Sequence, residues 1–305
     1  MGHTLLKNLE KLSSNIKIDE PMSLHTSFKV GGPADFFITP KSIKELANIY
    51  KFCKKENIPA FVMGKGTNIL VSDKGIRGVV IRVGDNLSNF TFKENMLDAE
   101  AGVDLAVISK AAAEKNLAGL EFSCGIPGSL GGAVIMNAGA YGGEIKDILV
   151  NTTYMNENGD IEKISTKDHK FRYRSSVLQE RKGIVLKSQL KLFEGKKENI
   201  EKTMEELTYL RKTKQPLDKP SAGSVFKRPE GYYAGKLIED SNLKGFQIGG
   251  AQVSNLHCGF IINKGNASSD DIINLINHIK GTVQDKFGVY LETEVKIVGE
   301  FASTY

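Results

Sequence analysis

The sequence predicts a protein of mixed helices and strands, with an α/β pattern in its first part, that contains two or three packed units. Its 305 residues exceed the size, about 250–300 residues, at which one hydrophobic core stops growing. Segments with apolar residues at helical spacing are interspersed with short apolar runs bounded by glycine. With 40% hydrophobic and 25% charged residues, the composition is that of an ordinary globular protein.

The first predicted elements are a helix from Ser42 and strands on either side of a glycine turn. Ser42 and Glu45 form the pattern of a capping box, and apolar residues recur after them at helical spacing. Residues 59–83 predict strand, glycine turn, short apolar run, turn and strand. A second helix is predicted over 103–117, before a glycine-rich stretch.

The middle of the chain is predicted to be rich in β structure. A hairpin is expected around Asn158 and Gly159, since this pair favours a tight turn, and 183–193 has the pattern of a strand. A polar helix over 196–213 ends before Pro216. The proline and charge content of the stretch that follows is typical of a domain boundary.

A smaller unit is predicted beyond this boundary. It contains an amphipathic helix with Ser269 as N-cap and Gly288 at the position that ends it. The segment 289–299 is predicted to be a final strand.

Charge and cysteine content exclude several classes of function. The net charge of +5 suits an anionic small molecule but is too small and too dispersed for nucleic acid. No apolar run reaches the length of about 20 residues that spans a membrane, and the N-terminus lacks a signal peptide, so a cytoplasmic protein is expected. Cys53, Cys124 and Cys258 are widely spaced, which predicts free thiols, no zinc and no other metal.

Two glycine-rich segments, 64–68 and 125–144, carry the main functional signal. The first contains G-x-G after a strand, but β structure follows it in place of the helix that a Rossmann dinucleotide site requires. Successive backbone N–H groups can bind phosphate without a helix. A nucleotide with a diphosphate is therefore the expected ligand, and the alternative is a set of tight turns and close backbone crossings.

Ordered motifs along nearly the whole chain resemble the UDP-N-acetylenolpyruvoylglucosamine reductase (MurB) family. They include MGKGTNILVSDKGIRGVVI, GLEFSCGIPGSLGGAVIMNAGAYGGEI, FRYRSSVLQE, SAGSVFKRPEGYYAGKLIEDSNLKGFQIGGAQVS and LETEVKIVGEF. The interval from Arg174 to Ser224 is short, which indicates the subclass that lacks an extra tyrosine-bearing loop over the substrate.

The resemblance implies an FAD-binding fold of the vanillyl-alcohol-oxidase (PCMH) type. Two α+β subdomains, 1–83 (rejoined by 298–305) and 84–214, would hold noncovalent FAD between them. A smaller α+β domain, 215–297, would cover the substrate, and the last strand should return to the first subdomain. The implied FAD contacts are Gly64, Gly66, Thr67, Asn68, Gly125, Gly128, Ser129, Gly132, Asn137 and Gly139.

The family reduces UDP-N-acetylglucosamine enolpyruvate to UDP-N-acetylmuramate with NADPH as hydride donor, and the resemblance implies which residues do so here. Arg174 would stabilise charge on the substrate carboxylate, since its planar guanidinium matches a carboxylate. Ser224 would donate a proton to C2, with Glu294 nearby, and Lys214 would bind the diphosphate. From the residues alone, three neighbours remain alternatives to the catalytic set: Arg172, Ser221 and Glu292.

Two other functions fit the glycine-rich segments taken alone. One is an FAD-dependent oxidase or dehydrogenase acting on an alcohol or sugar lactone, and the other is a nucleotide-binding module without catalysis. Small-molecule substrates are the expected partners, without nucleic acid or membrane, and a monomer is expected.

Overall fold

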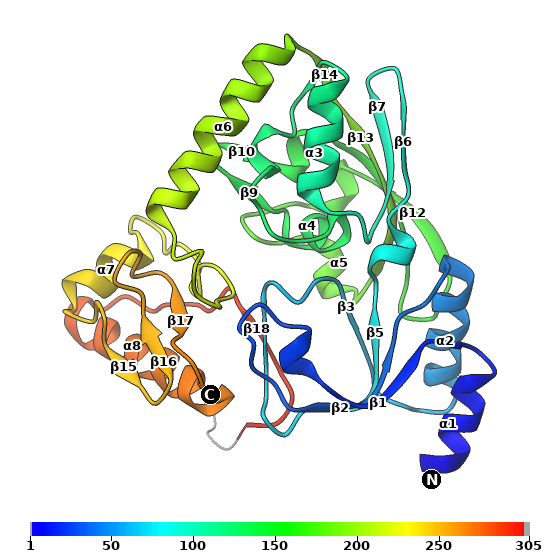
Figure 1. Cartoon of the computed structure of the whole chain (residues 1–305), viewed down its shortest axis with the longest axis horizontal. Coiled ribbons are helices and arrows are strands. Elements are labelled where there is room, and N and C mark those ends of the chain that lie inside the picture. Colours follow the sequence, from blue (N-terminus) through cyan, green and yellow to red (C-terminus); the bar gives the residue numbers. More distant parts are fainter. Residues whose placement is uncertain (1, 302–305) are drawn as a thin grey trace. The chain divides into compact units, whose positions relative to one another are not determined.

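The computed structural model describes residues 2–301 and divides into two compact units (Figure 1). Unit 1 comprises residues 2–17, 36–65 and 78–211 of the described chain, and unit 2 comprises residues 18–35, 66–77 and 212–301. Each unit has its own hydrophobic core of buried side chains.

The helices and strands follow one another in a mixed order along the chain. The helices are α1 (Gly2–Glu10), α2 (Ile43–Lys55), α3 (Leu105–Glu114), α4 (Leu130–Met136), α5 (Val177–Glu180), α6 (Lys197–Lys214), α7 (Ala234–Asp240) and α8 (Ser269–Phe287). The strands up to residue 118 are β1 (Ile16–Pro21), β2 (Pro33–Ile38), β3 (Ala60–Met63), β4 (Ile69–Val71), β5 (Ile76–Arg82), β6 (Phe90–Lys93), β7 (Met96–Glu100) and β8 (Leu117–Ala118). The later strands are β9 (Gly139–Ala140), β10 (Gly143–Glu144), β11 (Leu149–Met155), β12 (Ile161–Ser165), β13 (Ile184–Lys191), β14 (Phe193–Glu194), β15 (Gln247–Ile248), β16 (Ala251–Val253), β17 (Ile261–Asn263) and β18 (Lys296–Val298).

Unit 1 is built around a five-stranded antiparallel sheet with the strand order β12-β11-β13-β7-β6. The predicted hairpin is confirmed, because β11 and β12 pair and Gly159 adopts a φ of +85° in the turn between them. Helix α4 packs against β13 and β7. Strand β3 pairs in parallel with β5, which belongs to a sheet of order β1-β2-β5-β3. The first glycine-rich segment directly follows β3, and the second contains α4 and the β9–β10 pair.

Unit 2 combines a small sheet with two helices. Strands β15, β16 and β17 form an antiparallel sheet on which α8 packs, and α7 packs against α8 (Figure 1). Strand β18 pairs in parallel with β4, with Lys296 opposite Ile69. The expected return of the last strand to the first part of the chain is therefore confirmed, whereas the three-part division into 1–83, 84–214 and 215–297 stays a prediction.

Capping interactions fix the ends of two predicted helices. Ser42 caps α2 as expected, its hydroxyl accepting a hydrogen bond from the Glu45 N–H, but the Glu45 carboxylate accepts from the Lys41 N–H. The N-cap of α8 is Ser268, one residue before the predicted Ser269, and it forms a reciprocal capping box with Asp271. Gly288 ends α8 in the left-handed conformation with a φ of +68°, as predicted.

The segment predicted as a final strand is strand only at its end. Within 289–299 the regular strand is Lys296–Val298, and Thr293 forms an isolated bridge with Phe226. The predicted strand is therefore regular only over Lys296–Val298, and Glu292 and Glu294 flank the isolated bridge at Thr293.

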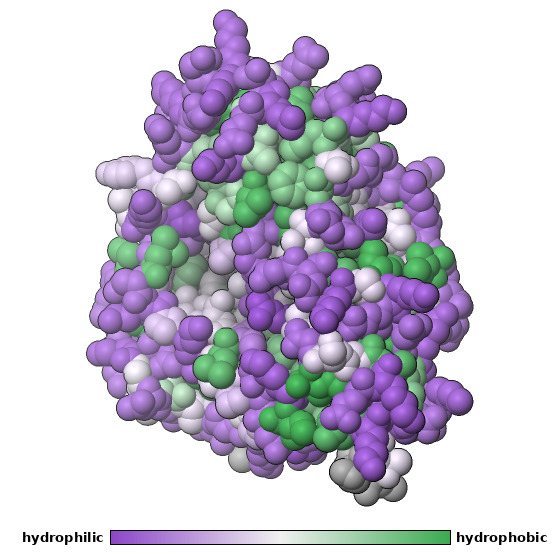
Figure 2. Space-filling view, turned by 45° about the vertical axis from the view of Figure 1, so that its right-hand side comes forward, coloured by the Kyte–Doolittle hydropathy of each residue, from purple (hydrophilic) through white to green (hydrophobic). Residues whose placement is uncertain are grey.

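The surface and the cysteines are those of a globular protein. Figure 2 shows one face on which hydrophilic side chains predominate and hydrophobic ones form small separate groups. Within residues 2–301, the helices are too short or too polar to cross a bilayer. The thiols of Cys53 and Cys258 are buried and that of Cys124 is half-buried, and burial raises the pKa of Cys53 to about 11.

Candidate active site

The start of the first glycine-rich segment, Gly64 and Lys65, meets the second segment in unit 1. A Cβ atom at Gly64 would lie 2.6 Å from the Ser129 Oγ, so only glycine leaves this hydroxyl in place. Lys65 forms an ion pair with Asp104, and Asp104 in turn forms an antiparallel bridge with Ser129. The sequence therefore predicted correctly that the first segment leads into β structure, and folding brings its start against the second segment.

Several backbone N–H groups in these segments donate to no protein acceptor. In the described part of the chain this holds for residues 65–68 and for Gly125, Gly128 and Ser129, whereas the N–H groups of Ile126 and Leu130 donate to carbonyls. Gly66 and Ser129 are buried, and a buried N–H without an acceptor is costly and rare in folded proteins. Within unit 1, an anionic ligand would satisfy the donors of Lys65, Gly125, Gly128 and Ser129, so these groups fit the diphosphate of a nucleotide cofactor.

Asn68 connects its segment with the region of Glu294 inside unit 2. Its side-chain amide donates to the Glu294 carbonyl at 3.1 Å, and its own carbonyl accepts from the Lys296 N–H at 3.0 Å. These bonds extend the pairing of β18 with β4 by one residue. The backbone of Glu294 is thereby anchored.

Arg211 lies beside the second glycine-rich segment, and the sequence reasoning missed it. A Cβ atom at Gly125 would lie 3.0 Å from its Cδ and 3.2 Å from its Nη1. Burial lowers the pKa of Arg211 from its ordinary value, with Tyr141 and Cys124 acting in the opposite direction. The residue lies three positions before Lys214 on the polar helix α6, which is rich in both lysine and glutamate, so its burial could not be predicted from the pattern.

Asn137 and Gly139, both expected to contact the cofactor, make close contacts within the protein itself. Asn137 is fully buried, and its amide donates to Glu144 Oε2 at 2.9 Å and to the Arg172 carbonyl at 3.2 Å. A Cβ at Gly139 would lie 2.6 Å from the Gly143 carbonyl oxygen. The geometry supports a positioning role for both residues, and their expected contacts with FAD stay predictions. Gly132, in contrast, is exposed in α4.

Arg174 occupies a strained position in a tight turn. Reciprocal backbone hydrogen bonds between Arg172 and Ser175 close the turn, and Arg174 has a φ of +51°. Left-handed backbone at a residue other than glycine costs about 1–3 kcal/mol and is concentrated at functional sites. The Arg174 guanidinium donates from Nη2 to the Gly139 carbonyl at 2.8 Å and lies over the Tyr173 ring. Since Arg172 is exposed and Arg174 half-buried, the structure favours Arg174 of the two.

Ser224 and Glu294 lie on neighbouring segments of unit 2. Val225 connects them, because its N–H donates to the Gly259 carbonyl at 2.9 Å and its carbonyl accepts from the Glu294 N–H at 2.7 Å. Ser224 pairs with Phe260 in an isolated bridge and is exposed, so its hydroxyl is open to a ligand. Ser221 is half-buried.

The structure separates the two glutamates that the sequence left as alternatives. Glu292 is exposed and its carboxylate forms an ion pair with Lys227. Glu294 is half-buried, and its backbone is bonded on both sides. Glu294 is thus the less exposed of the two glutamates, and its role in the reaction stays a prediction.

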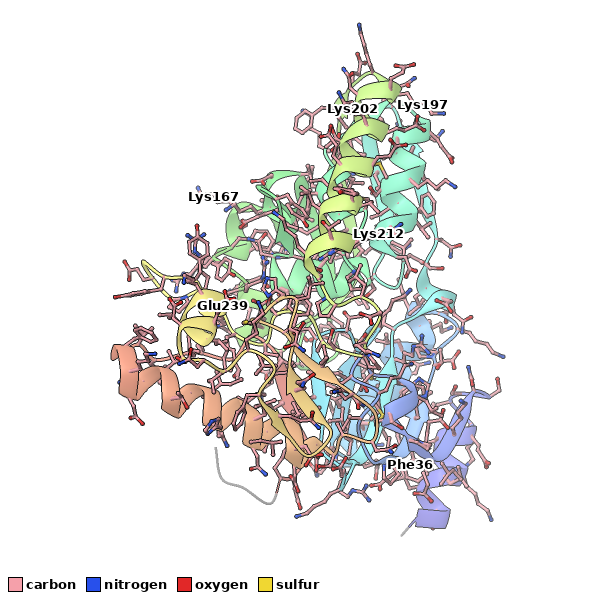
Figure 3. All side chains as sticks on the ribbon, turned by 60° about the vertical axis from the view of Figure 1, so that its left-hand side comes forward. Phe36, Lys167, Lys197, Lys202, Lys212 and Glu239 are labelled. Carbon is pink, nitrogen blue, oxygen red and sulfur yellow. The ribbon has the colours of Figure 1, made fainter. Side chains whose placement is uncertain are left out.

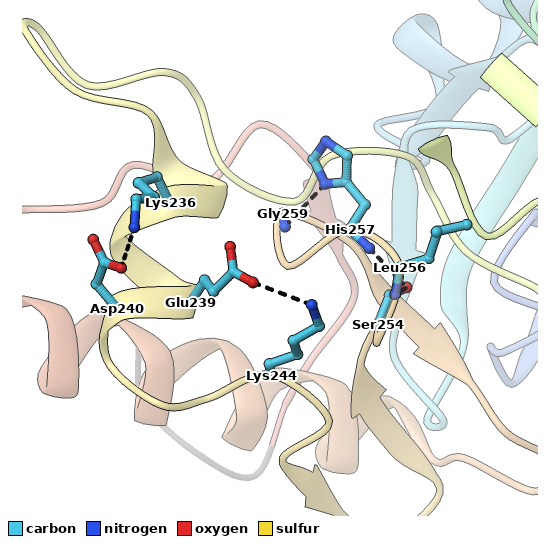
Figure 4. Close-up of polar contacts among 8 residues, drawn as sticks. All are labelled: Lys236, Glu239, Asp240, Lys244, Ser254, Leu256, His257 and Gly259. Carbon is cyan, nitrogen blue, oxygen red and sulfur yellow. Dashed lines mark hydrogen bonds and ion pairs between the residues drawn. The ribbon is translucent and has the colours of Figure 1, made fainter. Parts of the chain in front are cut away.

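A turn at 254–260 supports the strand segment opposite Ser224 (Figure 4). The Ser254 hydroxyl accepts from the N–H groups of Leu256 and His257, and His257 Nδ1 accepts from the Gly259 N–H at 3.1 Å. Burial lowers the pKa of His257, which keeps the acceptor nitrogen free of a proton. The Gly259 carbonyl in turn accepts a hydrogen bond from the Val225 N–H. No motif in the sequence signals this support.

Lys214 is the last residue of α6 and is exposed. Figure 3 shows Lys197, Lys202 and Lys212 spaced along the same helix, so lysine is common on its surface. Cations are favoured at a helix C-terminus, and this explains the position without a ligand. The role of Lys214 in binding a diphosphate stays a prediction.

Comparison with known proteins identifies the family. A model of the UDP-N-acetylenolpyruvoylglucosamine reductase C-terminal domain matches residues 215–298, and a model of an FAD binding domain matches residues 34–165. UDP-N-acetylenolpyruvoylglucosamine reductase from Caldanaerobacter subterraneus subsp. tengcongensis is 51% identical over 302 residues, which cover 98% of this chain and all of that protein. The protein of that name from Clostridioides difficile (strain 630) is 49% identical, and the match covers 97% of each chain.

Solved structures agree with the sequence comparison. The crystal structure of UDP-N-acetylenolpyruvylglucosamine reductase (MurB) from Thermus caldophilus has a TM-score of 0.80 and 35% identity, covering 92% of this chain and 99% of that one. Physcomitrella patens BBE-like 1 is 15% identical with a TM-score of 0.50, covers 62% of this chain and 44% of its own, and so shows the fold alone. The predicted α+β fold with a PCMH-type FAD-binding domain is confirmed. The chain belongs to the UDP-N-acetylenolpyruvoylglucosamine reductase family.

Proposed function

We propose that this protein catalyses the NADPH-dependent reduction of UDP-N-acetylglucosamine enolpyruvate to UDP-N-acetylmuramate, a step in the synthesis of peptidoglycan precursors. The observation that carries the proposal is the 51% identity with a reductase of this name over the full length of that protein. FAD is the proposed cofactor, since the FAD binding domain model covers 34–165. When bound, FAD would take hydride from NADPH and supply it to C3 of the enolpyruvyl group.

The proposed FAD site uses the free backbone donors of the two glycine-rich segments. Within unit 1, the N–H groups of Lys65, Gly125, Gly128 and Ser129 would hold the diphosphate, and the Ser129 side chain would add a hydroxyl group. The FAD contacts of Gly66, Thr67 and Asn68 that the family resemblance implies stay predictions. Neutral main-chain donors bind an anion without a nearby lysine, which matches the absence of lysine and arginine from 125–144.

The proposed catalytic residues deal with the charge that hydride addition creates. Hydride addition to C3 leaves negative charge on C2 and on its carboxylate, so a fixed cation lowers the barrier. Arg174 would supply that cation, Ser224 would transfer a proton to C2, and Glu294 would act beside C2. A serine hydroxyl is a weak acid, so Ser224 needs a group that polarises it and a replacement proton from water. Lys214 would bind the substrate diphosphate as a point charge.

Anaerobic rapid mixing tests the function directly. NADPH should bleach the flavin absorbance of the purified protein, and UDP-N-acetylglucosamine enolpyruvate should then restore it with the formation of UDP-N-acetylmuramate. Bleaching by an alcohol or a sugar lactone in place of NADPH would favour an oxidase or dehydrogenase. A flavin that neither NADPH nor those compounds bleach would favour a binding module without catalysis.

Replacing Gly64 with valine tests the proposed flavin cradle. The new side chain would occupy the position of the Ser129 hydroxyl, and crowding of this kind costs about 1–3 kcal/mol, so flavin affinity should fall about tenfold or more. The measurement is equilibrium dialysis of FAD against the apoprotein. Gly281→Val is the matched control, because a Cβ there meets open space, and its FAD affinity should equal that of the wild type. Equal affinities for the two variants would contradict the cradle.

We further propose that the protein acts in the cytoplasm as a monomer. The substrates are small molecules, and the helices within residues 2–301 include none that could cross a membrane. Sedimentation equilibrium at working concentration tests the monomer.

A further inference from the structure

The turn that carries Arg174 needs external support. Its left-handed backbone is costly, so neighbouring groups must fix it if the guanidinium is to keep one position. Side-chain amides hold the carbonyl groups on both sides of Tyr173. Asn137 donates to the Arg172 carbonyl at 3.2 Å, and Gln179 donates to the Arg174 carbonyl at 3.2 Å.

Glu144 is the residue that holds Asn137. The Glu144 carboxylate accepts from the Asn137 amide at 2.9 Å, and the Lys146 N–H donates to the Asn137 Oδ1 at 3.0 Å. The Asn137 side chain therefore both donates and accepts hydrogen bonds. The residue is fully buried and adopts the left-handed backbone conformation at the C-terminal end of α4. Removal of the carboxylate would leave a buried amide donor without its partner.

Glu144 also supports the acceptor of the guanidinium. It stands opposite Gly139 in the β9–β10 pair, and the Gly139 carbonyl accepts from Arg174 Nη2 at 2.8 Å. Glu144 therefore binds Asn137 with its side chain and pairs through its backbone with Gly139, whose carbonyl accepts from Arg174. Two of the contacts that hold the turn, the Asn137 bond to its backbone and the Gly139 bond to its guanidinium, therefore lie next to Glu144, whereas the Gln179 bond does not.

The charge on Glu144 is maintained by its surroundings. Burial raises its pKa, but hydrogen bonds from Lys146 and Asn137 and the charges of Lys146 and Arg174 outweigh burial, and the net pKa is lowered. Lys146 lies 2.6 Å from the carboxylate and takes the direct ion pair. Glu144 is thus an ionised acceptor near Arg174 that is paired mainly with another cation.

We propose that Glu144 is a positioning residue for Arg174, which acts through the Asn137 amide and the β9–β10 hairpin. This inference rests on the proposed function, because the position of Arg174 matters only if its guanidinium meets the substrate carboxylate. A misplacement of about 1 Å can cost a reaction about a hundredfold. Glu144 should therefore affect the transfer to the enolpyruvyl substrate and leave flavin reduction by NADPH unchanged.

Glu144→Gln tests the proposal, with Glu162→Gln as matched control. Glu162 is also a carboxylate of unit 1 that accepts from an asparagine amide, that of Asn156, but it lies in the β11–β12 hairpin. Glu144→Gln should slow flavin reoxidation by the enolpyruvyl substrate about 10- to 100-fold and leave KM for that substrate within about threefold of wild type. Glu162→Gln should leave both half-reactions unchanged.

A double variant distinguishes positioning from a loss of folding. If Glu144 acts through Arg174, Glu144→Gln should lower the rate of flavin reoxidation much less in the Arg174→Lys background than in the wild type. If the two residues act independently, their fold-losses in rate should multiply. Glu144→Asp keeps the charge and should recover part of the reoxidation rate. If Glu144→Gln does not fold, the rate of Glu144→Asp tests the positioning role instead. Equal rates for the Glu144 and Glu162 variants, or multiplying losses, would overturn the inference. Failure of the wild type to reduce the substrate would instead contradict the proposed function.

Discussion

Replacing Ser224 with alanine is expected to slow reoxidation of the reduced flavin by UDP-N-acetylglucosamine enolpyruvate about 10²- to 10⁴-fold, the usual contribution of a positioned general acid. Flavin reduction by NADPH should change little, because it requires no proton at C2 of the enolpyruvyl group. The backbone should be unaffected, since the bridge to Phe260 and the adjacent Val225–Gly259 bond involve main-chain atoms alone. Stopped-flow absorbance measures the two half-reactions separately.

Ser221→Ala is the control for Ser224→Ala, because both serines lie in the same SAGS stretch and Ser221 is half-buried. Its half-reactions should resemble those of the wild type. In Ser224→Ala the remaining turnover must take its proton from water, so its rate should fall in D₂O. Equal loss in both half-reactions, or a larger loss for Ser221→Ala, would contradict the proposed role of Ser224.

The sequence predicts the local elements of this protein well because their signals are local. The capping pattern at Ser42, the Asn-Gly turn at 158–159 and Gly288 after a long amphipathic stretch each place an element boundary. The final segment is a regular strand only in part, because alternation of residue types does not show where the pairing changes from one partner to another. There Glu292 and Glu294 pair with groups around Val225 and Lys227, and the regular ladder begins at Lys296.

The glycine-rich segments show how far residue types can predict a site. Their composition predicts exposed or unpaired backbone donors, and the structure has such donors at 65–68 and at Gly125. The same composition could not distinguish glycines that face a ligand from glycines that allow close packing. Gly139 belongs to the second group, because its neighbour across the hairpin, Glu144, leaves no room for a Cβ.

Supporting residues were beyond sequence reasoning because their partners are distant in the chain. Asn137 meets the Arg172 carbonyl 35 residues away, and the signal for that bond is a fold that places α4 beside the turn. Asn137 has the residue type of a ligand contact, so the pattern favoured that interpretation. Its burial and its hydrogen bonds within the protein are visible only in three dimensions, and its contact with FAD stays a prediction.

Arg174→Lys should lower the rate of flavin reoxidation by the enolpyruvyl substrate about 10²- to 10³-fold, the usual cost of removing one oriented donor from a developing charge. Lysine keeps the positive charge but loses the planar pair of donors that matches a carboxylate and that also reaches the Gly139 carbonyl. Arg172→Lys is the matched control from the same turn, and its rate should stay within about threefold of wild type because Arg172 is exposed. The left-handed backbone at 174 is retained in Arg174→Lys, since arginine and lysine have similar backbone preferences, so the difference reports on the guanidinium and not on relief of strain. Equal losses for the two variants would mean that the turn contributes general positive charge, and an unchanged Arg174→Lys would remove Arg174 from the mechanism.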